Sequence, residues 1–206
     1  MGKTVKIVLA GEGGQGVQSV AQIIAEAADE EGKQVLYIPN FGVEQRGGVS
    51  VAYVQIGDGP IGSPKFEKGD IVVALSDRAV QRTGRYVGPK TAFLYDSSIP
   101  VEKGDLPGDA GEILPIPAID TAKKELHPRV FNILILGAVL GATGVVPVDR
   151  ARLAIEKKLG YKFEKDPKLR DLNFRAMDRG MELVKKMAGQ RNGDTPSLFA
   201  NNKQII

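Results

Sequence analysis

The amino-acid sequence predicts an α/β protein, a three-layer α/β/α sandwich whose sheet is mostly parallel and includes a hairpin or an edge strand. Two observations lead to this fold class. Short apolar runs rich in β-branched residues alternate with helical patterns in the first part of the chain, and the last third is helical throughout. The length of 206 residues fits one domain, which we place at 1–188, followed by a polar tail at 189–206.

The first elements are a strand, a glycine-rich turn and a helix. Residues 5–10 are an apolar run, residues 11–16 hold the glycines, and the residues after them repeat at helical spacing. The helix ends near Gly32, a common helix stop, and residues 34–38 have the pattern of a second strand. A strand, a helix and a strand of this length predict a βαβ unit with a parallel strand pair. The core-facing residues of the helix are expected to be Val17, Val20, Ala21, Ile24, Ala27 and Ala28.

The next segment is irregular before the strand pattern returns. Residues 39–48 have no period and hold three glycines, whereas residues 49–56 alternate as a strand does, with Val49 and Tyr53 on the same face. Residues 57–60, with the sequence Gly-Asp-Gly-Pro, are a turn signal. We therefore expect a loop that is followed by a β-hairpin or by an edge strand.

The remaining elements alternate in the same way before the chain becomes helical. A short helix is expected to begin at Ser76-Asp77, because serine and aspartate are good helix starts. Strands are expected at 70–75, 91–95 and 112–116, a surface loop at 96–111 and a helix at 117–126. Three more helices are expected at 130–140, 148–159 and 169–187. The first of these three is apolar nearly all round, which places it in the interior or at an interface.

The composition excludes several classes of protein. The 28 Lys and Arg residues barely outnumber the 25 Asp and Glu residues, so we expect no nucleic-acid binding. The chain has no cysteine, so it forms no disulfide and ligates no iron–sulfur cluster through thiolates of its own. Its single histidine, His127, excludes a histidine-rich metal site. No apolar stretch approaches the ~20 residues of a membrane span, and no signal-peptide pattern is present. We therefore expect a cytoplasmic protein with no membrane association.

The glycine-rich turn has three interpretations on its residues alone. Gly11, Gly13 and Gly16 satisfy G-x-G-x-x-G between a strand and a helix, which is the pattern of a dinucleotide site. Such a site also needs an acidic residue at the end of the second strand to hold the ribose, and here that strand ends in Ile38-Pro39-Asn40. The glycines can instead serve tight packing of helix against strand. Alternatively, free N–H groups at the helix start can bind an anion.

Several motifs, in their order and spacing, resemble the γ subunit of 2-oxoacid:ferredoxin oxidoreductases. The resemblance covers about residues 5–187. It rests first on two glycine-rich segments, Gly11-Glu12-Gly13-Gly14-Gln15-Gly16-Val17 and Gly42-Val43-Glu44-Gln45-Arg46-Gly47-Gly48. It rests also on Ile61-Gly62-Ser63-Pro64 before the run at 70–75, and on Asn132, which opens a helix. The last helix adds Asn173, Ala176 and Gly180 in an Asn-x-x-Ala-x-x-x-Gly pattern.

The resemblance implies that the chain is one subunit of an anaerobic enzyme with α, β and ferredoxin-like δ subunits. Such enzymes decarboxylate a 2-oxoacid on thiamine diphosphate with Mg, pass electrons through Fe4S4 clusters to ferredoxin, and release an acyl-CoA formed from coenzyme A. The thiamine and cluster sites lie on other subunits, which agrees with the absence of cysteine here. The chain alone is therefore expected to hold no cofactor and to be inactive. A stand-alone dinucleotide-binding protein and a non-catalytic scaffold subunit are the alternatives.

Two departures from the family pattern bear on the substrate. Pyruvate-type γ chains tend to carry Gly-Arg-Ala-Gly-Gln-Gly at the first turn, and Arg-Thr-Gly where this chain has Arg46-Gly47-Gly48. The chain therefore looks closer to the 2-oxoglutarate, branched-chain or indolepyruvate types, and among these we expect 2-oxoglutarate.

The residues and the resemblance together give an expected site. N–H groups of the first turn and the Gln15 side chain are expected to meet a phosphate of coenzyme A or a partner's backbone. Arg46, flanked by glycines, is expected to reach the thiamine or coenzyme A site, because arginine pairs with carboxylate or phosphate. Asn132 is expected to brace the turn. No catalytic residue and no metal ligand is assigned. The expected cofactor-binding residues are Gly11, Gly13, Gly14, Gln15, Gly16, Arg46, Gly47 and Gly48, supported by Glu44, Asn132 and Asn173.

Overall fold

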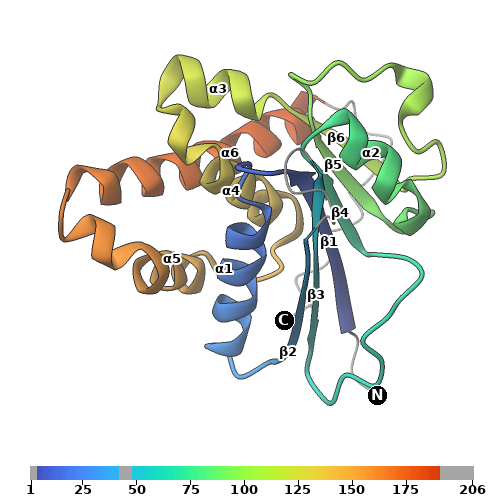
Figure 1. The fold of residues 1–206 in the computed structure, drawn as a ribbon, viewed down its shortest axis with the longest axis horizontal. Coiled ribbons are helices and arrows are strands. Elements are labelled where there is room, and N and C mark those ends of the chain that lie inside the picture. The colour runs from blue at the N-terminus through green and yellow to red at the C-terminus, as the bar shows by residue number, and fades with distance from the viewer. Residues whose placement is uncertain (1–3, 42–47, 191–206) are drawn as a thin grey trace.

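The fold is built on one six-stranded sheet, shown in Figure 1 for a computed structural model that describes residues 4–41 and 48–190. The strand order is β2-β3-β1-β4-β5-β6. The strands are β1 (Thr4–Glu12), β2 (Gln34–Asn40), β3 (Val49–Gly57), β4 (Ile71–Ala74), β5 (Ala92–Asp96) and β6 (Glu112–Ile116). The α-helices are α1 (Val17–Asp29), α2 (Asp77–Thr83), α3 (Ala118–Glu125), α4 (Phe131–Thr143), α5 (Val148–Phe163) and α6 (Lys168–Gln190).

The sheet is mixed, because β3 runs against both of its neighbours. β1, β4, β5 and β6 pair in parallel, whereas β3 pairs antiparallel with β1 and with β2. β1 and β2 therefore point the same way, as expected for a βαβ unit, but the expected direct pairing between them is wrong. The reason is burial: β3 is almost wholly buried and needs a neighbour on each side, while β2 is half-exposed and suits an edge.

Of the strands that precede and follow β3 in the chain, it is the preceding strand, β2, that pairs with β3. β3 pairs with the preceding β2, and the chain that leaves Gly57 runs through a long loop to β4 on the far side of β1. Asp70 fixes the end of that loop, because its backbone N–H donates to the Lys6 carbonyl at 2.8 Å and its carboxylate accepts from the Lys6 N–H at 2.8 Å. The hairpin turn expected at residues 57–60 is therefore wrong, and so is the edge position expected for residues 49–56.

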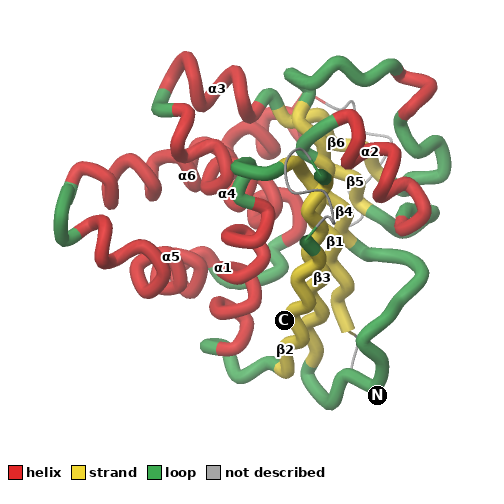
Figure 2. Tube along the Cα trace, viewed as in Figure 1, coloured by secondary structure: helices red, strands yellow, loops and turns green. Residues whose placement is uncertain are grey.

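Helices cover the two faces of the sheet unequally, as Figures 1 and 2 show. α1, α3, α4, α5 and α6 lie on one face, whereas the described segments on the other face are α2 and loops, including those after β3 and β5. β1 is buried from both sides: Ile7 and Leu9 pack toward the large helical layer, and Val8 and Ala10 pack toward α2. The expected three-layer sandwich is confirmed, with one thick and one thin outer layer.

Glycines let α4 and α6 pack with their backbones in contact. A Cβ built on Gly180 would lie 2.0 Å from the Leu134 carbonyl oxygen, and a Cβ on Gly137 would lie 2.0 Å from the Met177 carbonyl oxygen. Ala176, one turn before Gly180, is fully buried. The small residues of the Asn-x-x-Ala-x-x-x-Gly pattern therefore allow α6 to cross α4 closely. This packing holds the apolar α4 in the interior, as its composition predicts.

The C-terminal helix extends further than expected. α6 runs to Gln190, past the predicted end at residue 187, and the rest of the predicted tail lies outside the described residues. Within residues 4–41 and 48–190, no helix is both long enough and apolar enough to cross a membrane.

Candidate ligand site at the glycine-rich turn

The glycine-rich turn joins the end of β1 to the start of α1 at the carboxyl edge of the sheet. β1 continues through Glu12, so Gly11 lies in the strand and not in the turn. α1 begins at Val17, and its N-cap residue Gly16 has a left-handed φ of 76° with no side-chain cap. Gly14 is also left-handed, with φ 91°. The turn therefore needs glycine at two positions, and the uncapped first turn of α1 presents backbone N–H groups to a ligand.

The Gln15 side chain folds back onto the protein. Its Oε1 accepts from the Glu12 N–H at 2.6 Å, and its Nε2 donates to the Leu75 carbonyl at 2.7 Å. Leu75 follows β4, and its own N–H donates to the Ala10 carbonyl at 2.9 Å. These bonds tie the turn to the neighbouring strand. The Gln15 side chain therefore braces the turn, and both ends of its amide are already bonded within the protein.

The glycines of the motif divide into two pairs with different roles. A Cβ on Gly11 would lie 2.6 Å from the Gln15 Oε1, and a Cβ on Gly16 would lie 2.7 Å from the Asn132 Cβ. Both positions are closed by neighbouring side chains. In contrast, a Cβ on Gly13 or Gly14 would meet nothing within 4 Å, and both residues are exposed. Gly11 and Gly16 are thus required by packing, while Gly13 and Gly14 line the open side where a ligand would approach.

The two expected supporting asparagines lie in different places. Asn132, the second residue of α4, packs directly against Gly16, and its role as a brace of the turn stays a prediction. Asn173 lies in α6, is 7% exposed, and donates its Nδ2 to the Leu169 carbonyl at 2.6 Å. That bond lies within α6 and does not involve the turn.

The described residues on either side of the second glycine-rich segment lie at the same edge of the sheet as the first. Glu12 is in register with Val49, so Gly48 enters β3 beside the end of β1, and β2 ends at Asn40 on the same edge. The predicted meeting of the two glycine-rich segments is supported for their described ends. Glu44, Arg46 and Gly47 lie outside the described residues.

A polar network that the sequence did not reveal holds α1 against the strands. Gln18 Nε2 donates to the Ser50 hydroxyl at 2.7 Å and to the Val51 carbonyl at 3.1 Å, while Gln18 Oε1 accepts from the Tyr37 hydroxyl at 2.6 Å. Burial raises the pKa of Tyr37, so the phenol stays protonated and keeps donating. Gln18 thereby links the first turn of α1 to β2 and β3, the two strands that the second glycine-rich segment connects.

A buried carboxylate lies at the same edge of the sheet, at the end of β5. Asp96, at the end of β5, is fully buried and accepts from the Ser98 N–H at 2.9 Å and from the Ile119 N–H at 3.1 Å. Burial raises the pKa of Asp96 above its ordinary value, against the opposing effect of these hydrogen bonds. Ile119 lies in the first turn of α3, so Asp96 anchors a helix start. The sequence analysis had placed Asp96 in a surface loop, and that placement is wrong.

The strand order argues against a dinucleotide site. In that kind of site the acidic residue that binds the ribose ends the strand next to β1. Here β3 separates β2 from β1, so the end of β2 lies about 10 Å away across two strand spacings. The exposed Asn40 also occupies the position where an acid is needed.

The fold and the turn define an α/β protein with an uncapped, glycine-lined helix start at the carboxyl edge of a mixed sheet. Within the described part of the chain, no three His, Cys, Asp or Glu side chains form a group that could hold a metal ion. The family model for pyruvate ferredoxin/flavodoxin oxidoreductase matches residues 6–183. The chain therefore belongs to this family.

Relatives in the family are named for different 2-oxoacids. The chain is 31% identical to the ketoisovalerate oxidoreductase subunit VorA of Methanothermobacter thermautotrophicus, over 88% of this chain and 37% of that relative. It thus spans little more than a third of VorA. It is 33% identical to the pyruvate synthase subunit PorC of Thermotoga maritima, over 85% of this chain and 92% of that subunit.

A solved structure has the same fold. It is the 2-oxoglutarate:ferredoxin oxidoreductase from Magnetococcus marinus with 2-oxoglutarate, coenzyme A and succinyl-CoA bound. The match has a TM-score of 0.80 and 28% identity, and it covers 89% of this chain and 31% of that one.

Proposed function

We propose that the chain is the γ subunit of a multi-subunit 2-oxoacid:ferredoxin oxidoreductase. The whole enzyme would convert a 2-oxoacid and coenzyme A to an acyl-CoA, CO2 and reduced ferredoxin. Family membership supports this role, and so do the relatives named as oxidoreductase subunits. The observation that carries the proposal furthest is the open pair Gly13 and Gly14 in front of the uncapped α1.

In this role the turn binds an anionic phosphate of coenzyme A. A helix start attracts negative charge because its first N–H groups lack intrahelical partners and carry the positive end of the helix dipole. Gly13 and Gly14 present no side chain that would keep a phosphate away from the backbone. Gln15, bonded to Glu12 and Leu75, holds the turn in this shape before any ligand arrives.

The remaining cofactors of such an enzyme belong to other subunits in this proposal. The sequence has no cysteine for an Fe4S4 cluster, and no metal-binding group of carboxylates occurs in the described residues for the Mg of thiamine diphosphate. We place these groups on α, β and ferredoxin-like δ subunits and derive no step through them. This chain's contribution is to bind and orient coenzyme A at the edge of another subunit's site.

The substrate proposed is 2-oxoglutarate. The two departures from the pyruvate-type motifs favour it, and the relatives include enzymes for ketoisovalerate, pyruvate and 2-oxoglutarate. Competing the three oxoacids against one another in the assembled enzyme tests this choice. The highest kcat/KM should belong to 2-oxoglutarate, and a higher value for another oxoacid refutes the assignment.

Reconstitution tests the subunit role. The isolated chain should show no 2-oxoacid-dependent reduction of a viologen dye, and the assembled enzyme should show reduction that depends on both the oxoacid and coenzyme A. Leaving this chain out of the mixture should abolish the activity. Full activity in its absence would refute a required role.

A further inference from the structure

The two edges of the sheet differ in how they are protected. Free strand edges attract other strands, and proteins usually block them with charged residues, prolines or covering elements. β6 is five residues long and carries Glu112 and Pro115. β2 is seven residues long, carries no charge, and has a proline only next to its last residue. Among the described residues β2 pairs on one side only, with β3. Within residues 4–41 and 48–190, β2 is therefore an edge without the usual protection.

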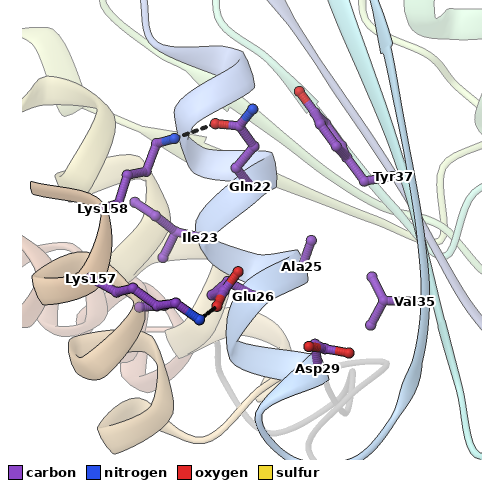
Figure 3. Close-up of a pocket in the computed structure, with 10 residues that line it drawn as sticks. Gln22, Ile23, Ala25, Glu26, Asp29, Val35, Tyr37, Lys157 and Lys158 are labelled. Atoms are coloured by element: carbon purple, nitrogen blue, oxygen red, sulfur yellow. Dashed lines mark hydrogen bonds and ion pairs between the residues drawn. The ribbon is translucent and has the colours of Figure 1, made fainter.

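A groove lies along the helical face of β2. This helix-face groove has a volume of about 470 Å³ and lies between α1, β2 and α5. Figure 3 shows Val35 and Tyr37 on one wall and the α1 residue Gln22 on the other. On the polar floor of this groove Lys157 of α5 pairs with Glu26 of α1, and Lys158 donates to the neutral Gln22 amide oxygen. Asp29 adds a second carboxylate, so the lining holds two cations and two anions.

A second groove lies along the opposite face of the same strand. This open-face groove has a volume of about 790 Å³ and is lined by Ile38 and Asn40 of β2. Its apolar wall is a cluster of three rings, in which Tyr53 lies 6.1 Å from Phe66 and 5.6 Å from Tyr86 between centroids, all in edge-to-face contact. Val35 and Tyr37 therefore line a groove on one face of the sheet, and Ile38 and Asn40 line a groove on the other.

The open-face groove carries more positive than negative charge. The Arg85 guanidinium lies 4.7 Å from the centre of the Tyr86 ring and donates to its hydroxyl at 2.7 Å. Lys65 adds a second cation, and Glu67 is the single carboxylate among the lining residues. The ring wall of the groove thus suits an apolar or aromatic side chain of a bound segment, and the two cations suit an acidic side chain next to it.

We propose that β2 is the docking edge for an extended, acidic segment of a partner subunit, which adds a seventh strand to the sheet. Main-chain hydrogen bonds to β2 supply affinity, and side chains of the segment alternate between the two grooves and supply specificity. The proposal rests on the proposed subunit role. A second copy of this chain is a poorer occupant, because its own β2 has no carboxylate to offer Arg85 and Lys65.

Hydrogen exchange of the full chain, alone and within the assembled enzyme, tests the docking edge. The β2 amides that point away from β3 should exchange quickly in the isolated chain and about tenfold more slowly in the enzyme, because docking pairs them. Amides of β6 should change little. Equal exchange of β2 in the two states overturns the proposal while leaving the subunit role intact. Failure of the chain to join any complex overturns both.

A pair of leucine substitutions provides the matched test. Leu36→Glu places a negative charge on β2 at a half-buried position, where it repels an acidic segment, whereas Leu153→Glu makes the same change on α5 at an exposed position outside both grooves. Leu36→Glu should weaken assembly about tenfold while Leu153→Glu leaves it unchanged. The melting temperature of each isolated variant reports whether it folds. Equal assembly of the two folded variants overturns the proposal, and so does a wild-type dimer that Leu36→Glu dissociates without affecting assembly.

Discussion

The substitution Gly16→Ala should destabilise the isolated chain by about 3 kcal/mol, because it adds two separate costs. The first is backbone strain: the φ of Gly16 is 76°, a region that costs an L-residue about 1–2 kcal/mol. The second is overpacking. The new Cβ would lie 2.7 Å from the Asn132 Cβ and 2.8 Å from its Nδ2, and such crowding costs about 1–3 kcal/mol.

Gly13→Ala is the matched control in the same turn. A Cβ there meets nothing within 4 Å, and the Gly13 φ is not left-handed, so the stability should change by less than about 0.5 kcal/mol. Urea unfolding followed by circular dichroism measures both variants. In thermal melts, Gly16→Ala should lower the Tm by roughly 6–12 °C and Gly13→Ala should leave it nearly unchanged.

A double mutant separates the two costs of Gly16→Ala. Asn132→Gly removes the atoms that the new Cβ would strike, while the backbone strain stays. The pair should therefore be about 1 kcal/mol more stable than the sum of the single changes predicts. Equal melting temperatures for Gly16→Ala and Gly13→Ala, or strict additivity in the cycle, would refute this account of the turn.

Three further predictions concern the bracing and packing around the site. Gln15→Ala removes both bonds of the brace and leaves two backbone groups without those partners, so it should cost about 1–3 kcal/mol in urea unfolding; a cost near zero would contradict the brace. Because the folded-state pKa of Asp96 is raised, the stability that the carboxyl group contributes is greatest below its ordinary pKa near 3.8 and is lost as pH rises through the raised value. Asp96→Asn should therefore gain stability relative to wild type as pH rises from acid to neutral. If the stability of the two proteins changes with pH in the same way, burial does not raise the pKa of Asp96. Gly180→Ala pushes a methyl to within 2.0 Å of a backbone oxygen on α4 and should cost more than about 3 kcal/mol or prevent folding, whereas Gly160→Ala, in open space on α5, should not destabilise the chain.

Local patterns were sufficient to predict most elements. Ser76 is an example, since its hydroxyl accepts from the Ala79 N–H at 3.2 Å at the start of α2, as a serine at a helix start should. The alternation in residues 49–56 correctly separated the two faces of β3, with Val49 and Tyr53 on the α2 side. These features depend on neighbours within a few residues, which the sequence displays directly.

Strand order was not predictable in the same way. The insertion of β3 between β1 and β2 depends on which strand is buried on both faces, and that is a property of the whole sheet. The strand, helix and strand pattern at the N-terminus is the same whether or not a third strand lies between the pair. The strand, helix and strand pattern therefore predicted the parallel direction of β1 and β2 correctly and their direct pairing incorrectly.

The roles of the motif glycines were also hidden in the sequence. Spacing alone makes Gly11, Gly13 and Gly16 equivalent, but the side chains that crowd Gly16 belong to Asn132, 116 positions away. Gln18 likewise finds Ser50 and Tyr37 only after the strands have assembled. The sequence therefore marks the turn as a candidate site, and the fold decides which of its glycines are open and which are closed by neighbouring side chains.

The KM for coenzyme A in the assembled enzyme carrying Gly13→Ala tests the proposed role of the turn most directly. Because the methyl group enters the open side of the turn without disturbing stability, it should displace a phosphate from the backbone N–H groups. Losing one charge-assisted hydrogen bond should raise the KM for coenzyme A about tenfold or more, with the KM for the 2-oxoacid unchanged. An unchanged KM for coenzyme A in a stable, fully assembled variant would contradict a phosphate site at this turn.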